Sequence, residues 1–440
     1  MQKIIQKHLD TFGVSEKDLL NDLRGYYKPS FFYIYLKGSF NIDLDLLSIK
    51  DRGTFVHEYI HYVQNIATYW GLYSSIVRYQ ELMEFKSHLI TSETVDIPVV
   101  VYYSEKLRKK NDWVIFGNGT SSFSDSRSWN INSEHKITIE KEIINLHGNG
   151  SEKIKLTIQF DDDRIEQIDL GSHIIKESMA ALYQSLVDAD AEHDDVPYNL
   201  IKILCEQHFS NISDDIEKLI CICYASLFSM TPGSELISLL ERASTEPDMD
   251  GMSIFSEFVD TKTILDESGN RHNIVDYFDV LVDGFKQLLE ANLQADLDYI
   301  NKVLERIRLS NRSLPYLTIL YDPNKLSADN LNAIVGYLGI PYIQTLNNGY
   351  HFPQSTKEGA AEEEEEEASV DVLELIAQEA MFSYMTRPKD HKICPLYYMC
   401  SGSEYDKDGC IGAPWEEPLC SFTIVSSPFS LNEKTITWRF

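Results

Sequence analysis

Residues 53–64 read Gly-Thr-Phe-Val-His-Glu-Tyr-Ile-His-Tyr-Val-Gln and contain the pattern His-Glu-x-x-His. Side chains four residues apart lie on one face of an α-helix, so His57 and His61 can direct two imidazole nitrogens at a single metal ion. Glu58 lies about 100° around the same helix from His57 and can lean over an open coordination position. The pattern therefore predicts a helix-borne metal site in which Glu58 is the general base.

The flanking residues predict that this motif lies on an amphipathic helix. Apolar residues recur there at spacings of three and four: Phe55, Val56, Ile60, Val63, Ile66 and Ala67. Thr54 or Asp51 can cap the start of the helix, and Gly71 is a candidate for the residue just beyond its end. The alternative is a buried helix with two incidental histidines. Two neutral imidazoles one turn apart on the apolar side need partners, however, which favours a metal.

The motif resembles the active-site helix of the zincin metallopeptidases over residues 56–61, Val-His-Glu-Tyr-Ile-His. The residues that follow resemble a group of uncharacterised bacterial His-Glu-x-x-His proteins: Gln64, Asn65, Thr68, Gly71 and Leu72. The resemblance covers one short helix, and only weak similarities extend further along the chain. It implies a zinc-dependent peptidase with Zn²⁺ as its cofactor, but it does not imply a particular substrate.

A third ligand is needed, because catalytic zinc generally binds three protein side chains and a water molecule. In the glutamate-ligated zincins this ligand lies on a second helix, often with a small residue close behind it. Glu177 fits this description, because Ala180 and Ala181 would let its helix approach the first one closely. The separation between His61 and Glu177 is longer than in most of that family, and an intervening insertion would account for the excess.

Glu81 is the rival third ligand, because its separation from His61 is close to the shorter family spacing. If the chain reverses near Gly71, an antiparallel helical hairpin would place Glu81 level with His61. Glu84 is the next candidate. Most glutamates on helices face solvent, and this remains the alternative for Glu177, Glu81 and Glu84.

The resemblance implies a mechanism in which zinc polarises the scissile carbonyl and activates a water molecule. Glu58 would accept the proton of the water and pass it to the leaving amine. The developing oxyanion needs a second donor, and His173 and Tyr183, which flank Glu177, are candidates. The commoner roles of such residues are a histidine near the start of a helix and a packed tyrosine.

The charge of the chain narrows its possible partners. The 39 Lys and Arg residues face 69 Asp and Glu, which gives a formal net charge of −30. A nucleic-acid partner is disfavoured because phosphate binding needs a basic surface, and anionic lipid is disfavoured for the same reason. An acidic surface instead suits a protein or peptide substrate that is itself basic.

The chain has no apolar run of about 18 residues and no signal-peptide pattern at its start, so we expect a cytoplasmic protein without membrane spans.

The seven cysteines fall into two groups. Cys205, Cys221 and Cys223 lie in apolar helical segments and are expected to be core thiols. The other four lie in the tail: Cys394, Cys400, Cys410 and Cys420. Their spacings do not match the paired cysteines of zinc ribbons, so a second structural metal site and free thiols or disulfides both remain open.

The order of patterns predicts an α+β fold with a zincin-like active-site helix beside a mixed sheet. Four regions are expected: 1–94 with N-terminal strands and the active-site helix, 95–170 as a β-rich insertion, 171–310 as an α-rich lobe, and 311–440 as a mixed C-terminal region with an acidic run and the cysteine-containing tail. Residues 30–36 and 40–46 are strand-like and are candidates for the sheet edge beside the helix. The insertion, with a hairpin turn at Asn149-Gly150, could form a flap over the site.

The C-terminal region, 311–440, contains fewer patterns that predict secondary structure than the rest of the chain. Residues 316–321 read as a strand, 327–338 and 372–385 read as helices, and 362–367 are six consecutive glutamates typical of a solvated linker. No phosphate-binding loop, dinucleotide-binding fingerprint or Gly-x-Ser-x-Gly elbow is present. The alternative to a peptidase is a non-catalytic interaction protein that keeps zinc for stability, which the acidic composition and the large regions outside the motif would suit.

Overall fold

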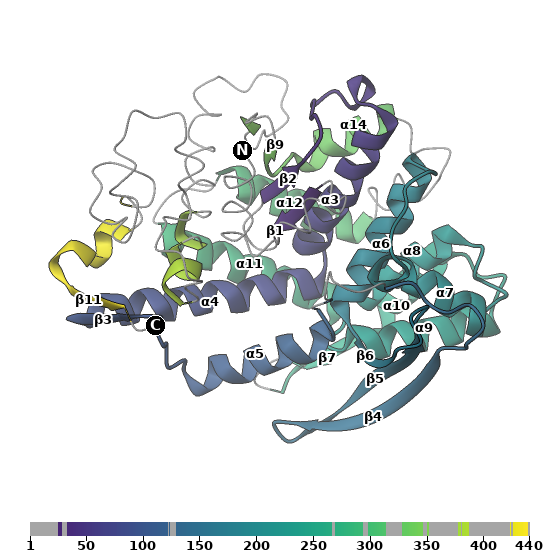
Figure 1. Ribbon diagram of the computed structural model, residues 1–440, viewed down its shortest axis with the longest axis horizontal. Helices are drawn as coiled ribbons and strands as arrows, with labels where there is room; N and C mark the ends of the chain where they lie inside the picture. The colour runs from purple at the N-terminus through teal and green to yellow at the C-terminus, as the bar shows by residue number, and fades with distance from the viewer. Residues whose placement is uncertain are drawn as a thin grey trace.

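The computed structural model has an α+β fold in which helices predominate and the strands form small separate sheets (Figure 1). The predicted α+β class is therefore confirmed. The structure describes residues 25–28, 33–121, 123, 129–265, 269–293, 298–313, 328–345, 350–351, 377–379, 381–386, 423 and 426–438. Three predicted features lie outside these residues: the strand at 316–321, the acidic run at 362–367, and the tail cysteines Cys394, Cys400, Cys410 and Cys420.

The His-Glu-x-x-His motif lies on helix α3, Ile49–Ala67, as its periodicity predicts. The helix begins earlier than expected, because Ser48 is its cap and accepts a hydrogen bond from the Asp51 N–H at 3.1 Å. Neither of the predicted caps is correct. Thr54 lies inside the helix, where its hydroxyl donates to the Lys50 carbonyl at 3.1 Å and so gains a partner without ending the helix.

A second helix, α4 (Tyr69–Thr91), follows α3 without a loop. Thr68 separates the two, and its hydroxyl oxygen accepts a hydrogen bond from the Gly71 N–H at 3.0 Å. Gly71 therefore belongs to the first turn of α4 rather than to the end of α3. A Cβ at Gly71 would lie 2.3 Å from the Gln64 carbonyl oxygen, so only glycine lets the two helices meet at this corner.

A four-stranded mixed sheet lies beside α3. Its strand order is β1 (Gly25–Lys28), β2 (Tyr33–Leu36), β9 (Tyr342–Thr345) and β10 (Tyr350–His351), with β2 and β9 parallel and the other pairs antiparallel. The predicted strand near residue 33 is therefore confirmed, but it is an inner strand. Among the described strands, β1 forms the edge of the sheet next to α3.

The predicted strand at 40–46 is wrong, because this segment contains bends and a short 3₁₀ helix, Leu44–Leu46. The Asn41 side chain accepts a hydrogen bond from the Asp43 N–H at 2.9 Å, and the Asp43 side chain accepts one from the Asp45 N–H at 3.2 Å. Such side-chain bonds to the backbone two residues ahead form turns and compete with strand pairing. The alternating polar residues that suggested a strand are thus the residues that prevent it.

The segment predicted to be β-rich also contains a helix. Strand β3 (Thr94–Ile97) pairs in parallel with β11 (Thr435–Trp438), and helix α5 (Glu105–Asn118) follows it. Strands β4 (Thr138–Leu146), β5 (Asn149–Gln159) and β6 (Ile165–Leu170) then form an antiparallel sheet. The region expected to be a β-rich insertion, 95–170, therefore contains a helix as well as strands.

The β4–β5 hairpin turns at His147 and Gly148, where φ is 52° and 89°, rather than at Asn149-Gly150. Positive φ at both central residues is the requirement of the tight turn that suits twisted strands. The sheet does not form the expected flap over α3. It packs against helix α9 (Pro232–Thr245), where Ser234 donates a hydrogen bond to Glu152 at 2.6 Å, and Figure 1 shows the hairpin projecting away from α3.

The predicted α-rich region is helical. Its helices are α6 (Ser172–Val187), α7 (Leu200–His208), α8 (Ile216–Ser226), α9, α10 (Gly251–Thr261), α11 (Ile274–Leu293) and α12 (Asp298–Ser313). A short hairpin of β7 (Thr263–Leu265) and β8 (Arg271–Asn273) separates α10 from α11. Cys205, Cys221 and Cys223 are free thiols in the core, as predicted. Helix α14 (Ala328–Leu338) matches the helix predicted at 327–338.

Two hydrophobic clusters hold these elements together. The larger one joins α3, the mixed sheet and the helical region, and its members run from Tyr27 to Ile343. The smaller one surrounds the second half of α4 and includes Phe85, Val95 and Phe382. Among the described residues, no helix combines the length and the apolar character needed to cross a bilayer.

Three glycines fix the start of α6, the helix that carries Glu177. The φ of Gly119 is 66°, and its hypothetical Cβ would lie 2.8 Å from the nitrogen of Gly171, the residue that caps α6. A Cβ at Gly233 would lie 2.0 Å from the carbonyl oxygen of Leu170. Because these backbone segments touch directly, contacts between backbone atoms fix the first turn of α6. No adjustable side chain lies between them.

We predict that Gly233→Ala destabilises the protein by about 1–3 kcal/mol, because the methyl group collides with backbone that cannot rotate away. The matched control is Gly284→Ala on α11, where a Cβ would meet nothing within 4 Å. That change should stabilise the protein by about 0.5–1 kcal/mol through helix propensity. Urea unfolding followed by circular dichroism measures both, and equal effects would contradict the proposed contact at Gly233.

Candidate metal centre

Helices α3 and α6 pack against each other in antiparallel directions, and this contact builds the site. Gly53 on α3 lies beside Asp188 at the end of α6, where a Cβ on Gly53 would come within 2.7 Å of the Asp188 Cβ. Towards the other end, the Gln64 side chain reaches the Lys176 carbonyl at 3.1 Å. Ala180 is fully buried, as expected of a small residue that permits close approach.

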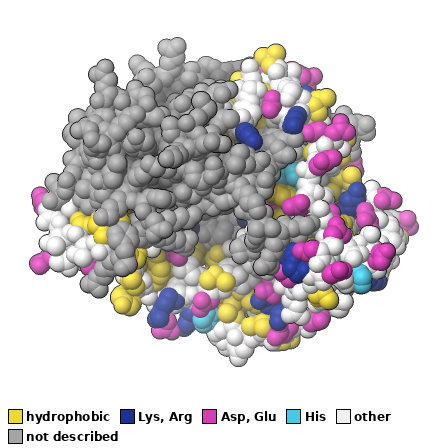
Figure 2. All heavy atoms as spheres, in the orientation of Figure 1, with side chains coloured by type: hydrophobic (Ala, Val, Ile, Leu, Met, Phe, Trp, Pro, Cys, Tyr) yellow, Lys and Arg dark blue, Asp and Glu magenta, His cyan; other side chains and the backbone are white. Residues whose placement is uncertain are grey.

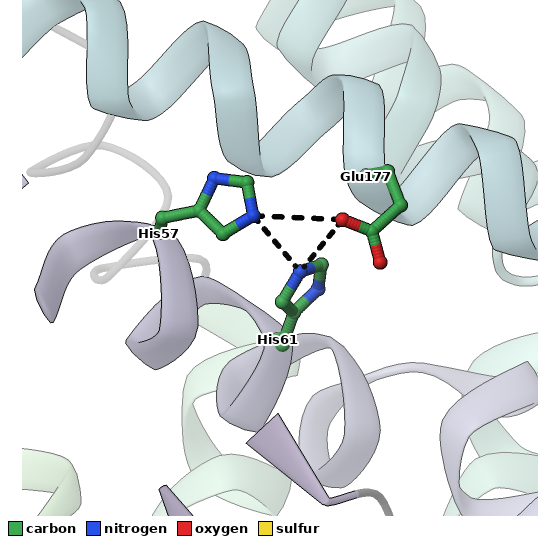
Figure 3. A group of neighbouring side chains, drawn as sticks. All are labelled: His57, His61 and Glu177. Carbon is green, nitrogen blue, oxygen red and sulfur yellow. Dashed lines mark hydrogen bonds and ion pairs between the residues drawn. The ribbon is translucent and has the colours of Figure 1, made fainter. Parts of the chain in front are cut away.

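This packing brings the three predicted ligands together (Figure 3). His57 Nε2 lies 3.3 Å from His61 Nε2, and Glu177 Oε2 lies 3.5 Å and 3.3 Å from these two nitrogens. Among the described residues, this is the one group of His, Cys, Asp or Glu side chains whose ligand atoms converge closely enough to hold a metal ion. Two histidines come from α3 and the glutamate from α6.

The separations between the donor atoms suit a tetrahedral metal ion. Ligand bonds of about 2.0–2.1 Å place the ligand atoms of tetrahedral zinc about 3.3–3.4 Å apart. The observed separations of 3.3, 3.3 and 3.5 Å match this value, whereas hydrogen bonds between such groups are usually about 2.7–3.2 Å long. Two imidazoles and one carboxylate are also a donor set found in catalytic zinc sites.

The local electrostatics favour the protonation state that metal binding requires at Glu177 and His57, whereas at His61 burial is outweighed by the nearby Glu177, which raises the pKa, so that a metal ion must displace a proton there. Burial alone would raise the pKa of Glu177, but the adjacent His61 and His57 outweigh it and hold this pKa well below its ordinary value. Burial lowers the pKa of His57, which favours the neutral ring. An ionised carboxylate next to a neutral imidazole is the state in which both groups can donate electron pairs.

Glu58 lies between the triad and the mixed sheet. Its side chain is 5% exposed, and a Cβ on Gly25 of strand β1 would lie 3.1 Å from its Oε1. Burial raises the pKa of Glu58 to about 8; His61 lowers it and Glu177 raises it further. A carboxyl group with a pKa near neutrality is suited to accept and release a proton during a reaction.

The rival ligands have other partners, so neither belongs to the triad. Glu81 accepts hydrogen bonds from Arg78 at 2.9 Å and from Asn111 at 2.8 Å. Glu84 accepts from the N–H and the hydroxyl of Ser104 at the start of α5. The expected hairpin reversal fails because Thr68 caps a new helix at the corner, and α4 then carries both glutamates away from His61.

The two predicted oxyanion donors have ordinary structural surroundings. The His173 ring stacks on Phe123 at a centroid distance of 5.9 Å, and Tyr183 is fully buried in the hydrophobic core. Two residues that were not predicted lie beside the triad. The rings of His193 and Tyr198 lie 5.7 Å and 5.8 Å from the His57 ring.

A loop that returns along α6 explains why His193 and Tyr198 were missed. The loop leaves the end of α6 at Asp188 and comes back over the same helix, where the Ser178 hydroxyl donates to the Pro197 carbonyl at 2.7 Å. Asp195 anchors it further by accepting a hydrogen bond from the Ile131 N–H at 2.7 Å. No local sequence pattern encodes such a returning loop. The one signal in the sequence was His193 itself, a potential metal ligand soon after the helix that carries Glu177.

Two glutamines also lie at the site without having been predicted to act there. Gln64 Oε1 lies 3.0 Å from Nδ1 of His61, and Gln184 Oε1 lies 2.9 Å from Nε2 of His193. Both glutamines are buried.

Comparisons of the chain with protein-family models, with curated proteins and with solved structures gave no match.

We predict that the triad binds one divalent metal ion per chain. His57→Ala, His61→Ala and Glu177→Ala should each remove a ligand and reduce the metal content of the purified protein strongly. Glu81→Ala removes a carboxylate that faces Arg78 and Asn111, so it should leave the metal content unchanged. Elemental analysis after incubation with Zn²⁺ and desalting measures all four variants. Full metal content in Glu177→Ala would contradict the assignment of the third ligand.

Proposed function

We propose that the chain is a zinc-dependent metallopeptidase in which His57, His61 and Glu177 hold Zn²⁺ and Glu58 is the general base. The observation that carries this proposal is the convergence of three ligand atoms at tetrahedral spacings, from two helices that lie far apart in the sequence. The sequence places a carboxylate directly after the first ligand, as the zincin active-site helix does. The small mixed sheet beside α3 also suits a zincin-like arrangement.

In this proposal zinc would polarise the scissile carbonyl and lower the pKa of a bound water molecule to about 7. Glu58 would hold a proton taken from water on its carboxylate and would deliver it to the leaving amine. Its buried position next to Gly25 limits competing solvent, and its raised pKa matches the two opposite transfers that one carboxylate must perform. Glu177 remains ionised throughout and serves only to hold the metal.

Strand β1 is the part of the sheet best placed to guide a substrate. It is one of the two edge strands of this sheet among the described strands, β10 being the other, and its first residue, Gly25, lies against the Glu58 side chain. Backbone N–H and C=O groups at a sheet edge can pair with an extended peptide. We therefore infer that the substrate is a protein or peptide bound in an extended form beside β1.

The loop between α6 and Tyr198 favours a positively charged substrate. Asp190, Glu192 and Asp194 are exposed on this loop, and none of them forms an ion pair with a residue that the structure describes. The same loop places His193 next to His57, so the carboxylates border the site. Figure 2 shows acidic side chains spread over the side of the molecule where Figure 1 labels α6 to α9, in keeping with a net charge of −30. Such a rim attracts basic segments.

We predict that Glu58→Gln lowers peptide hydrolysis by about 10²–10⁴-fold, the usual effect of losing a general base. The amide keeps the size of the side chain and all three ligands, so zinc content should stay at the level of the unmodified protein. The measurement is cleavage of a peptide library followed by mass spectrometry, beside elemental analysis. Unchanged hydrolysis in this variant would contradict the role of Glu58.

We predict that neutralising the loop raises KM for basic peptides and leaves kcat unchanged. The variant combines Asp190→Asn, Glu192→Gln and Asp194→Asn, and three rim charges should change KM by about 3- to 10-fold. The difference should shrink as salt is added, because exposed charges are screened. The matched control combines Glu206→Gln, Asp214→Asn and Asp248→Asn, three exposed carboxylates elsewhere on the helical region. Equal effects of both triple variants would show that net charge, not the loop, sets the preference.

The burial of the site favours one alternative, an interaction protein that keeps zinc for stability. His57 is 6% exposed and Glu58 is 5% exposed, as in a structural metal site that needs no access for substrate. Chelation distinguishes the two functions. A protein that unfolds when zinc is removed, and that cleaves no peptide when zinc is present, would support the structural role.

A further inference from the structure

Gln64 is the side chain that joins the two ligand-bearing helices at the triad. It is fully buried on α3, one turn beyond His61. Its amide nitrogen donates to the Lys176 carbonyl on α6 at 3.1 Å, and its amide oxygen lies 3.0 Å from Nδ1 of His61. Lys176 directly precedes Glu177, so one amide group contacts the backbone next to one ligand and the ring of another.

The direction of these two hydrogen bonds determines the tautomer of His61. The Lys176 carbonyl can only accept, so the NH₂ end of Gln64 must face it. The oxygen end of Gln64 then faces His61 and can only accept, so Nδ1 of His61 must carry the proton. In a neutral imidazole the lone pair is then on Nε2. Nε2 is the atom that lies 3.3 Å from both Glu177 Oε2 and His57 Nε2.

His57 has no comparably close bond at its second ring nitrogen. Its Nδ1 is buried without a close hydrogen-bond partner among the described residues, and the Gln184 side chain interacts with this ring. Metal-binding histidines usually donate their second ring N–H to a carboxylate, a carbonyl or water, and loss of that partner typically costs about 10–100-fold in metal affinity. The two histidines therefore differ: Gln64 on α3 links Nδ1 of His61 to the backbone of α6, whereas Nδ1 of His57 has no such link among the described residues.

We propose that Gln64 is a positioning residue that presets His61 for metal binding and fixes the register of α3 against α6 with the same amide. The inference rests on the proposed function only in requiring that the triad binds zinc, not that the protein cleaves peptides. The two ends of the amide should be separable by substitution. The oxygen end governs metal affinity through His61, and the nitrogen end governs the stability of the metal-free helix pair.

Three variants test this separation. Gln64→Met has the length of glutamine without its hydrogen bonds, so zinc affinity should fall about 10–100-fold and the metal-free protein should melt at a lower temperature. Gln64→Glu keeps an oxygen for the Nδ1 proton but places a carboxylate against the Lys176 carbonyl. It should therefore lower the melting temperature of the metal-free protein while retaining zinc affinity.

The control is Asn65→Leu, the neighbouring buried amide on α3, which accepts a hydrogen bond from Ser75 and contacts no ligand. It should lower the melting temperature and leave zinc affinity within about 3-fold, because His61 keeps its partner. Competition of each variant with a chromophoric chelator for Zn²⁺, without any substrate, gives the affinities. If Gln64→Met and Asn65→Leu bind zinc equally well, Gln64 is only a packing residue and the proposal is overturned.

A measurement on the unmodified protein makes the test independent of variant folding. Nitrogen NMR of ¹⁵N-histidine-labelled, metal-free protein in alkaline buffer should show His61 with its proton on Nδ1. A proton on Nε2 would overturn the proposal even if zinc binds. Failure of the peptidase proposal gives a different result, because zinc would then bind with the expected dependence on Gln64 while no peptide is cleaved.

Discussion

The site depends on the antiparallel contact between α3 and α6, because neither helix holds enough ligands alone. A slip of one helix by a single residue would move its side chains by about 1.5 Å along the axis. Metal–ligand distances tolerate only about 0.2 Å, so such a slip would separate Glu177 from the two histidines. The close approach at Gly53, the small buried Ala180 and the Gln64 bond to Lys176 all restrict this sliding.

The long segment between the two helices has a structural role that differs from a flap. Strand β6 ends at Leu170 and leads through Gly171 directly into α6. Backbone contacts among Gly119, Gly171 and Gly233 tie this junction to α5 and α9. The inserted sheet therefore supports the first turn of α6, and the position of Glu177 depends on residues far from it in the sequence. Glu177 is far from His61 in the sequence because the segment that forms this sheet lies between them.

The parts of the site that could be predicted are those encoded at short range or by chemistry. The i, i+4 spacing fixes His57 and His61 on one helix face, and small residues after Glu177 signal a close helix contact. The prediction of a strand at 40–46 was wrong because the Asn41 and Asp43 side chains accept hydrogen bonds from the nearby backbone. The prediction of Glu81 as a ligand was wrong because Thr68 caps a new helix where a reversal of the chain was expected. His193 and Tyr198 depend on a returning loop, which no local pattern reveals.

The charges of the site indicate why metal binding and packing would reinforce each other. The carboxyl groups of buried Glu58 and partly exposed Glu177 lie near the same pair of imidazoles, and their pKa values are displaced in opposite directions. A charge in an apolar region is costly unless an opposite charge offsets it. A divalent ion held by Glu177 and two neutral histidines would offset the charge of Glu177 and lower the pKa of Glu58. Metal binding would then favour the α3–α6 contact, and that contact would in turn preset the ligand positions.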